Sequence, residues 1–174
     1  MKTHFFGLVS LIALGMAILF TAPAQAQSSL TEAQIAAVES AEFRDWDGNV
    51  VRVSDFEGKT VLIDFWETWC SPCLAIMPAL NQLMTDFPDD FVVLAVSPGW
   101  SDTEAVVRRF IDQHDYDFIF VHGDELATKL EIRGIPYKVY VRPDGTFYKT
   151  ETGSRGPERE FNAISEVIEN NRGE

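Results

Sequence analysis

An apolar segment, two cysteines and a helical pattern follow one another in the middle of this chain and strongly limit its fold. Residues 61–66 are apolar except for Asp64, which is typical of a central strand covered on both faces. Cys70 and Cys73, the only two cysteines in 174 residues, come next. From residue 71 or 72 to about 87, apolar residues recur at helical spacing. We therefore expect a buried strand that leads through the cysteines into a helix.

The rest of the chain alternates strand-like and helix-like segments. This order predicts a single α/β domain in which helices cover both faces of a central mixed sheet. We expect further strands at 91–96 and 118–121. We also expect two hairpins, one over 43–53 that turns at 47–49 and one formed by 137–141 and 146–150. We expect further helices at 28–39, 102–113 and 125–132, and a last helix that Pro157 opens.

The first residues have the pattern of a secretory signal. A short polar start precedes an apolar run over 5–20, and Ala24-Gln25-Ala26 offers the small residues that a signal peptidase recognises. We expect a signal peptide over 1–26 with cleavage after Ala26, and the alternative is an uncleaved membrane anchor. Residues 27–40 would form an N-terminal helical extension and residues 41–174 the domain. The protein is then expected in the periplasm or otherwise exported.

Charge excludes one class of partner. The chain has 14 basic and 27 acidic residues, for a formal net charge of −13. Such a surface repels nucleic acid and anionic lipid, so we expect no nucleic-acid partner. Basic protein partners are compatible with it, but the simpler interpretation is a well solvated surface.

The spacing of the two cysteines indicates chemistry rather than a structural staple. Export leads to an oxidising compartment, where disulfides persist. A disulfide that closes a loop over only two intervening residues stabilises a fold weakly. Cys70 lies where the strand ends and the helix begins, a place that favours a thiolate. We expect Cys70 to attack as the nucleophile and the more buried Cys73 to resolve the mixed disulfide, in either direction.

Asp64 is the charged residue inside the most apolar strand, six residues before Cys70. A buried carboxyl there has a raised pKa and can exchange a proton with Cys73. The alternative is a carboxyl at a strand edge that reaches solvent or a lysine.

Together these motifs resemble the thioredoxin superfamily, and more closely its exported TlpA/ResA-like branch, which is related to the redoxin or AhpC-TSA proteins. In that branch an N-terminal hairpin ends in Ser-Asp-x-x-Gly-Lys, and a βα unit is inserted before a late proline; 62 residues separate Cys73 from Pro136 here. The resemblance covers about residues 41–172. The matching residues are Asp64-Phe65-Trp66-x-x-Trp69-Cys70-Ser71-Pro72-Cys73, Pro78, Gly134-Ile135-Pro136 and Ser54-Asp55-Phe56-Glu57-Gly58-Lys59.

The resemblance implies a thioredoxin-like fold and a thiol–disulfide oxidoreductase of the protein-disulfide reductase type, without a cofactor. Its partners would be cysteine-containing exported proteins, which it would reduce, as relatives do in cytochrome c maturation or in general thiol reduction. An upstream thiol electron donor, which a membrane-embedded protein can supply, would reduce it in turn. Ile135-Pro136 would be the cis-proline loop beside the disulfide, and the backbone of Ile135 would pair with the substrate chain.

Apolar residues around Cys70 are candidates for substrate binding, suited to an extended or unfolded chain. Trp100 joins this set or is an aromatic at the edge of the core. The candidate residues are Trp69, Pro72, Ile135, Pro136 and Tyr137.

Three residues depart from the pattern of the resembled families. Tyr137 stands where they have Thr or Ser, and Asp64 where the TlpA/ResA-like branch often has Asn. Glu67 stands where a small residue is common; its charge opposes a thiolate at Cys70 if it lies near, and the simpler interpretation is a solvated loop carboxylate. These departures bear on redox potential and partner choice.

Two other functions share parts of this pattern. A peroxiredoxin needs Pro-x-x-x-Thr/Ser-x-x-Cys, but Glu67 and Ile63 stand at the threonine and proline positions before Cys70, and Cys73 fits no better. A copper-handling metallochaperone would bind Cu(I) through Cys70, Cys73 and a histidine, for which His122 after a strand is the candidate. Copper proteins of this kind space their cysteines by three residues rather than two, so we expect no metal site.

Overall fold

The computed structural model describes residues 30–172, and the expected signal peptide lies outside them. Seven strands form one mixed sheet in the order β2-β1-β5-β4-β3-β6-β7. Strands β3, β4 and β5 are parallel, whereas β1, β6 and β7 run antiparallel to their neighbours. The elements are α1 (Glu32–Glu39), β1 (Glu42–Asp45), β2 (Val50–Arg52), the 3-10 helix η1 (Val53–Phe56), β3 (Thr60–Phe65), α2 (Ser71–Asp86), β4 (Phe91–Ser97), α3 (Glu104–Gln113), β5 (Ile119–His122), α4 (Asp124–Lys129), β6 (Tyr137–Val141), β7 (Phe147–Thr152) and α5 (Pro157–Asn171).

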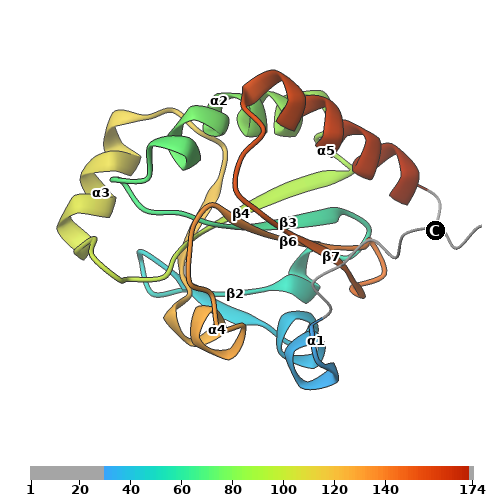
Figure 1. Ribbon diagram of the computed structural model, residues 1–174, viewed down its shortest axis with the longest axis horizontal. Coiled ribbons are helices and arrows are strands. Elements are labelled where there is room, and N and C mark those ends of the chain that lie inside the picture. The colour runs from blue at the N-terminus through green and yellow to red at the C-terminus, as the bar shows by residue number, and fades with distance from the viewer. Residues whose placement is uncertain (1–29, 173–174) are drawn as a thin grey trace, which may run out of the picture.

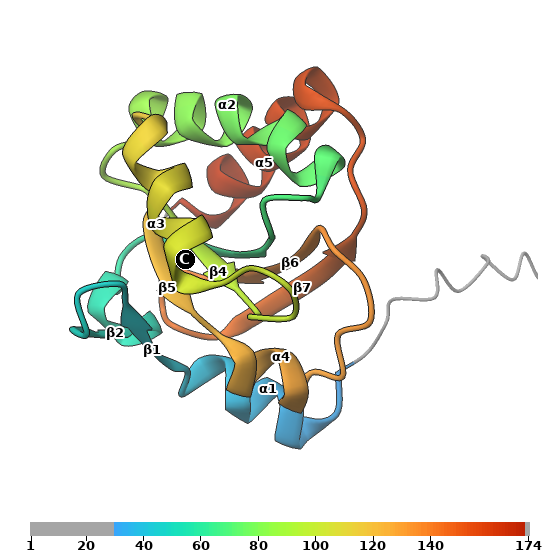
Figure 2. The same ribbon diagram turned by 90° about the vertical axis from the view of Figure 1, so that its left-hand side faces the viewer.

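Helices cover both faces of the sheet, as the sequence predicts. Helices α2, α3 and α5 lie on one face, and α1 and α4 lie on the other (Figures 1 and 2). Each face has its own apolar cluster, one built around Trp66 and Met77 and the other around Phe65 and Leu94. Every residue of β3 and β4 is buried, which explains why these two strands have nearly continuous apolar sequences.

The sheet brings two distant segments of the chain to one edge. Strand β3 ends at Phe65, and the chain continues from there to the cysteines. Strand β6 runs antiparallel to β3 and begins at Tyr137, directly opposite Phe65. Residues 135 and 136, which precede β6, therefore lie at the same edge as the exit from β3. Between α2 and β6 the chain adds β4, α3, β5 and α4, which accommodates the expected inserted βα unit.

The N-terminal helix packs on the domain, a point that its sequence left open. Its expected capping box is present, since the Thr31 side chain accepts a hydrogen bond from the Gln34 backbone N–H and Gln34 accepts one from the Thr31 backbone. Val38 is fully buried, and the Glu39 carboxylate accepts from the backbone N–H of Phe147 at 2.9 Å. Residues 30–172 contain no helix that is both long and apolar enough to cross a bilayer.

Some helix ends differ from the sequence prediction for local reasons. The third helix begins at Glu104 rather than 102, because the Asp102 carboxylate binds the backbone N–H and the hydroxyl of Thr68 instead. Helix α4 ends at Lys129 rather than 132, since Glu131 has a positive φ of 53° that does not continue a helix.

Candidate active site

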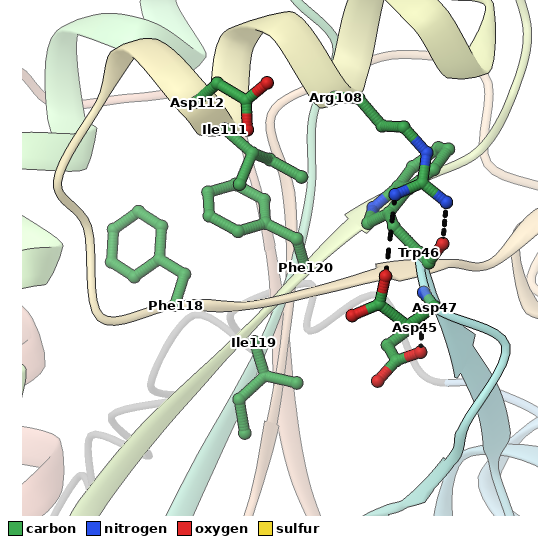
Figure 3. Close-up of a pocket in the computed structure, with 9 residues that line it drawn as sticks. All are labelled: Asp45, Trp46, Asp47, Arg108, Ile111, Asp112, Phe118, Ile119 and Phe120. Carbon is green, nitrogen blue, oxygen red and sulfur yellow. Dashed lines mark hydrogen bonds and ion pairs between the residues drawn. The ribbon is translucent and has the colours of Figure 1, made fainter.

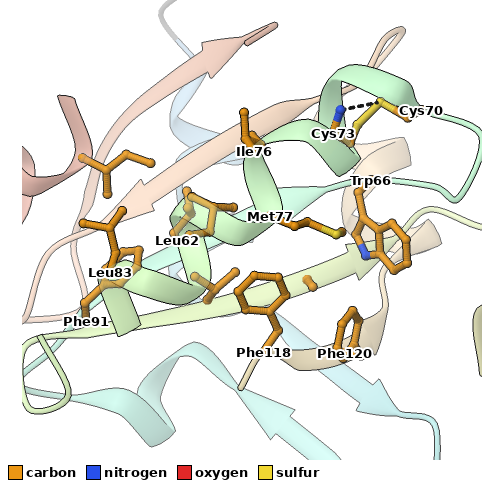
Figure 4. Close-up of a cluster of buried hydrophobic side chains, with 14 of the residues drawn as sticks. Leu62, Trp66, Cys70, Cys73, Ile76, Met77, Leu83, Phe91, Phe118 and Phe120 are labelled. Carbon is orange, nitrogen blue, oxygen red and sulfur yellow. Dashed lines mark hydrogen bonds between the residues drawn. A yellow bond between two sulfur atoms is a disulfide. The ribbon is translucent and has the colours of Figure 1, made fainter. Parts of the chain in front are cut away.

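The two cysteines form a disulfide at the start of α2. Cys70 caps the helix, and the backbone N–H of Cys73 donates to Cys70 Sγ at 3.3 Å. Unpaired N–H groups at a helix N-terminus stabilise negative charge, so the same contact favours a Cys70 thiolate after reduction. Cys73 is the more buried of the two thiols, as expected, but the difference is small, since Cys70 is 2 % exposed and Cys73 0 %. Figure 4 shows the pair above Trp66 and Met77.

The peptide bond between Ile135 and Pro136 is cis, as the resemblance implied. Pro136 is buried and Ile135 is half-buried at the edge where β3 ends. The backbone N–H of Gly153 donates to the Pro136 carbonyl at 2.8 Å, which ties this loop to the end of β7. The cis-proline loop and the start of α2 thus lie at one end of β3.

Trp69, which directly precedes Cys70, and Trp100 are both exposed, at 55 % and 43 %. The buried Glu67 carboxylate joins them: it accepts from the Trp69 indole N–H, from the backbone N–H of Trp100 at 2.6 Å and from that of Ser101 at 3.1 Å. The simpler interpretation of Glu67 as a solvated loop carboxylate is therefore wrong. Glu67 instead holds two loops together, and sequence reasoning missed this because the second loop lies over 30 residues away. Trp100 is exposed rather than part of the core edge.

Asp64 lies on the sheet face that α2 covers, between Leu62 and Trp66 in the alternation of β3. It is 1 % exposed, so it does not reach solvent, and its Oδ1 has no hydrogen-bond partner among the described residues. Burial raises the pKa of this carboxyl to about 7, the Lys138 ammonium opposes the rise, and the Glu160 carboxylate adds to it. A carboxyl with this pKa can take up or return a proton near neutral pH.

The other two candidate binding residues, Pro72 and Tyr137, differ in exposure and in position. Pro72 is exposed in the first turn of α2. Tyr137 is half-buried, and its ring contacts the edge of Phe65 with a centroid distance of 6.2 Å. That contact is on the sheet face of α1 and α4, opposite to α2.

The histidine considered for copper binding lies against an aromatic ring. The His122 ring is 3.7 Å from the Trp46 ring, centroid to centroid. Across residues 30–172, no three His, Cys, Asp or Glu side chains come together in a way that could hold a metal ion.

A pocket of about 490 Å³ lies away from the cysteines, between α3 and the β1–β5 edge (Figure 3). Trp46 and Phe120 line it, and Arg108 closes one side through contacts with Asp47 and the Trp46 carbonyl. Neither cysteine lines this pocket.

Sequence reasoning also missed a buried ion pair close to Asp64. Lys138 on β6 and Glu160 on α5 are both fully buried and in direct contact. A lysine inside the apolar strand 137–141 was a visible signal of the same kind as Asp64. Glu160 gave none, because acidic residues are ordinary in the first turn of a helix.

Comparisons with known proteins agree with this geometry. The AhpC/TSA family model matches residues 32–149. The thiol-disulfide oxidoreductase ResA of Oceanobacillus iheyensis is 35% identical over 110 residues, which are 62% of this chain and 57% of that protein. The thioredoxin-like protein YneN of Bacillus subtilis is 39% identical over 72 residues, 41% of this chain and 42% of that protein. The matches thus span less than two thirds of these two relatives.

Solved structures show the same fold. The exposed lipoprotein thioredoxin Etrx1 of Streptococcus pneumoniae superposes with a TM-score of 0.63 at 29% identity, over 75% of this chain and 98% of that one. StoA of Bacillus subtilis superposes with a TM-score of 0.59 over 71% of this chain and 95% of that one, and at 22% identity it supports the fold alone. With the family model covering most of its length, this chain belongs to the AhpC/TSA family, as a TlpA/ResA-like member of the thioredoxin superfamily.

Proposed function

We propose that this chain is an exported thiol–disulfide oxidoreductase that exchanges its Cys70–Cys73 disulfide with the cysteines of exported proteins, chiefly as their reductant. The observation that carries the proposal is the Cys70–Cys73 disulfide at the N-terminus of α2, at the same sheet edge as cis-Pro136. The names of the ResA relatives support the same activity. The reaction needs two thiols and no cofactor.

Reduction of a partner takes two exchange steps. The Cys70 thiolate attacks one sulfur of the partner disulfide, and the other partner sulfur leaves as a thiolate. Cys73 then loses its proton and attacks Cys70 Sγ, which releases the second partner sulfur as a thiolate. The two electrons have passed to the partner, and Cys70–Cys73 is again a disulfide. A donor dithiol, which a membrane-embedded thiol protein can supply, restores the reduced state by the reverse exchange.

Two features support binding of an extended partner chain at this site. Glu67 links the two exposed tryptophans Trp69 and Trp100, and a contiguous exposed apolar patch marks a protein-binding surface. By analogy with the resembled family, the backbone of Ile135 would pair with the partner chain next to its reacting cysteine. Export rests on the signal-like sequence over 1–26.

Trapping tests the activity and names the partner. A Cys73→Ser variant can make the mixed disulfide at Cys70 but cannot resolve it, so partner proteins should remain attached until a reductant is added. The matched control is Cys70→Ser, which keeps one thiol but lacks the nucleophile. Equal trapping by both variants would contradict the assignment of Cys70 as the attacking thiol.

The direction of electron flow is tested by equilibrium with glutathione. A potential near about −270 mV, the value of thioredoxin, supports a reductant, and one near about −120 mV, the value of DsbA, contradicts it.

A further inference from the structure

A buried charge network lies next to Asp64, between β6, β7 and α5. Lys138 Nζ contacts Glu160 Oε1, donates to the Gly153 carbonyl at 3.0 Å and lies 4.0 Å from Glu151 Oε2. The other Glu160 oxygen accepts from the backbone N–H of Arg155 at 3.0 Å. Burying charges is costly, so a pair of this kind does not by itself indicate a gain in stability.

Lys138 stands directly opposite Asp64 in the antiparallel β3–β6 pair. Directly opposite residues point to the same face, with Cβ atoms about 5 Å apart. On the other side of β3, the residue opposite Asp64 is the apolar Ala95 of β4. Helix α2, which covers this face, carries the fully buried Cys73. The Lys138 ammonium is therefore the nearest counter-charge that the sheet offers to Asp64.

Two other ionisable groups on this side, Glu151 and Tyr140, keep a constant charge near neutral pH. Burial works against the charge of Glu151, but hydrogen bonds from Arg155 and Lys149 lower its pKa to about 2. Burial, and then the Glu151 and Glu160 carboxylates, raise the pKa of Tyr140 far above the neutral range. The Glu151 carboxylate accepts a hydrogen bond from Arg155 and lies 4.0 Å from Lys138 Nζ. Asp64 is the carboxyl in this group whose pKa lies near 7.

We propose that Lys138 and Glu160 are positioning residues that set the protonation of Asp64 with opposite signs, and thereby the pH range in which Cys73 resolves the mixed disulfide. Lys138 favours the Asp64 carboxylate, which can accept the Cys73 proton. Glu160 limits that effect, because its negative charge partly cancels the ammonium. The inference rests on the proposed function and assigns that site two residues outside the cysteine motif.

The step that the network controls is a balanced proton and electron-pair transfer. The Cys73 thiol gives its proton to the Asp64 carboxylate, and the resulting thiolate forms a bond to Cys70 Sγ. The bond between Cys70 and the partner sulfur breaks, and the partner leaves as a thiolate. When Asp64 is already protonated, it cannot accept the proton and the step slows.

An aryl disulfide probe separates this step from the first one. Reduced protein that attacks dithiobis(nitrobenzoate) releases one coloured thiolate when Cys70 reacts and a second when Cys73 resolves. Stopped-flow absorbance gives the rate of the second release, which is measured from pH 5 to 9 for each variant. In the wild-type protein this rate should rise with pH through a midpoint near that of Asp64, and Asp64→Asn should remove that midpoint.

The two single variants should move the midpoint in opposite directions. Lys138→Met removes the cation and should raise the midpoint by about one pH unit, the usual effect of losing a nearby opposite charge. The second release should then be roughly fivefold slower at the wild-type midpoint. Glu160→Gln removes the carboxylate that directly contacts the cation and should lower the midpoint. Lys138→Arg keeps the positive charge and should leave the midpoint unchanged.

A purely structural role would not give shifts of opposite sign. Unchanged midpoints in both variants, or shifts in the same direction, overturn the inference. If a single variant does not fold, the neutral pair Lys138→Met with Glu160→Leu replaces it, and its midpoint should lie above that of the wild type. A midpoint equal to that of the wild type then overturns the inference. Failure of the proposed function is a different result, namely no thiolate release that depends on Cys70.

Discussion

The buried carboxyl of Asp64 should make the oxidised protein less stable at high pH. Its pKa is about 7 in the fold, against 3.8 for an unperturbed aspartate. Because the folded pKa is the higher one, the neutral form favours folding. That contribution is complete below pH 3.8 and is lost as the pH rises through 7. At 1.36 kcal/mol per pKa unit, the difference corresponds to about 4 kcal/mol.

Replacing Asp64 by asparagine removes the titration and keeps the size of the side chain. We expect the free energy of unfolding of Asp64→Asn, relative to the wild type, to increase by about 4 kcal/mol between pH 4 and pH 8.5. Urea unfolding of the disulfide-bonded protein at the two pH values measures it. Asp64→Leu, which also lacks a titrating group, should show the same change with pH. If the difference in unfolding free energy between Asp64→Asn and the wild type does not change with pH, Asp64 is not a buried carboxyl with a raised pKa.

Three further substitutions test other contacts. Glu67→Ala removes the acceptor of three hydrogen bonds in the site, and urea unfolding should show a loss of about 3 kcal/mol or more. Gly123→Ala would bring a Cβ to 2.0 Å from Val96 Cγ1, so it should lower the free energy of unfolding by about 1–3 kcal/mol. Adding Val96→Ala should recover part of that loss, and no recovery would contradict the clash. Thr31→Ala removes the cap of α1 and should cost about 1 kcal/mol of unfolding free energy, with m unchanged.

The order of the elements was predictable because each depends on local patterns. The continuous apolar sequences of β3 and β4 indicate strands covered on both faces, and helical periodicity together with Pro72 indicates α2. The Gly134-Ile135-Pro136 segment pointed to the cis bond through resemblance rather than through physical reasoning. The cysteine pair was equally visible, since it contains the only cysteines of the chain.

Contacts between distant segments could not be predicted in the same way. Glu67 has the sequence of an ordinary loop carboxylate, and its burial depends on a loop whose N–H groups at Trp100 and Ser101 meet it only in the fold. Glu160 likewise becomes a buried charge only because α5 packs over Lys138. In both cases the chemistry of the residue is plain in the sequence, whereas its partner is set by tertiary structure.

The carboxylate of Glu67 has a consequence for how strongly a partner can bind. A large exposed side chain normally loses conformational freedom when a partner orders it, at about 0.5–1.5 kcal/mol for each immobilised group. The Trp69 indole is already fixed through its N–H, and the backbone of Trp100 is fixed by the same carboxylate. Part of the entropy that association would cost at the Trp69 side chain is therefore lost during folding. A partner chain that contacts Trp69 would therefore meet a side chain that is already ordered, so binding there would cost less entropy than at a mobile side chain.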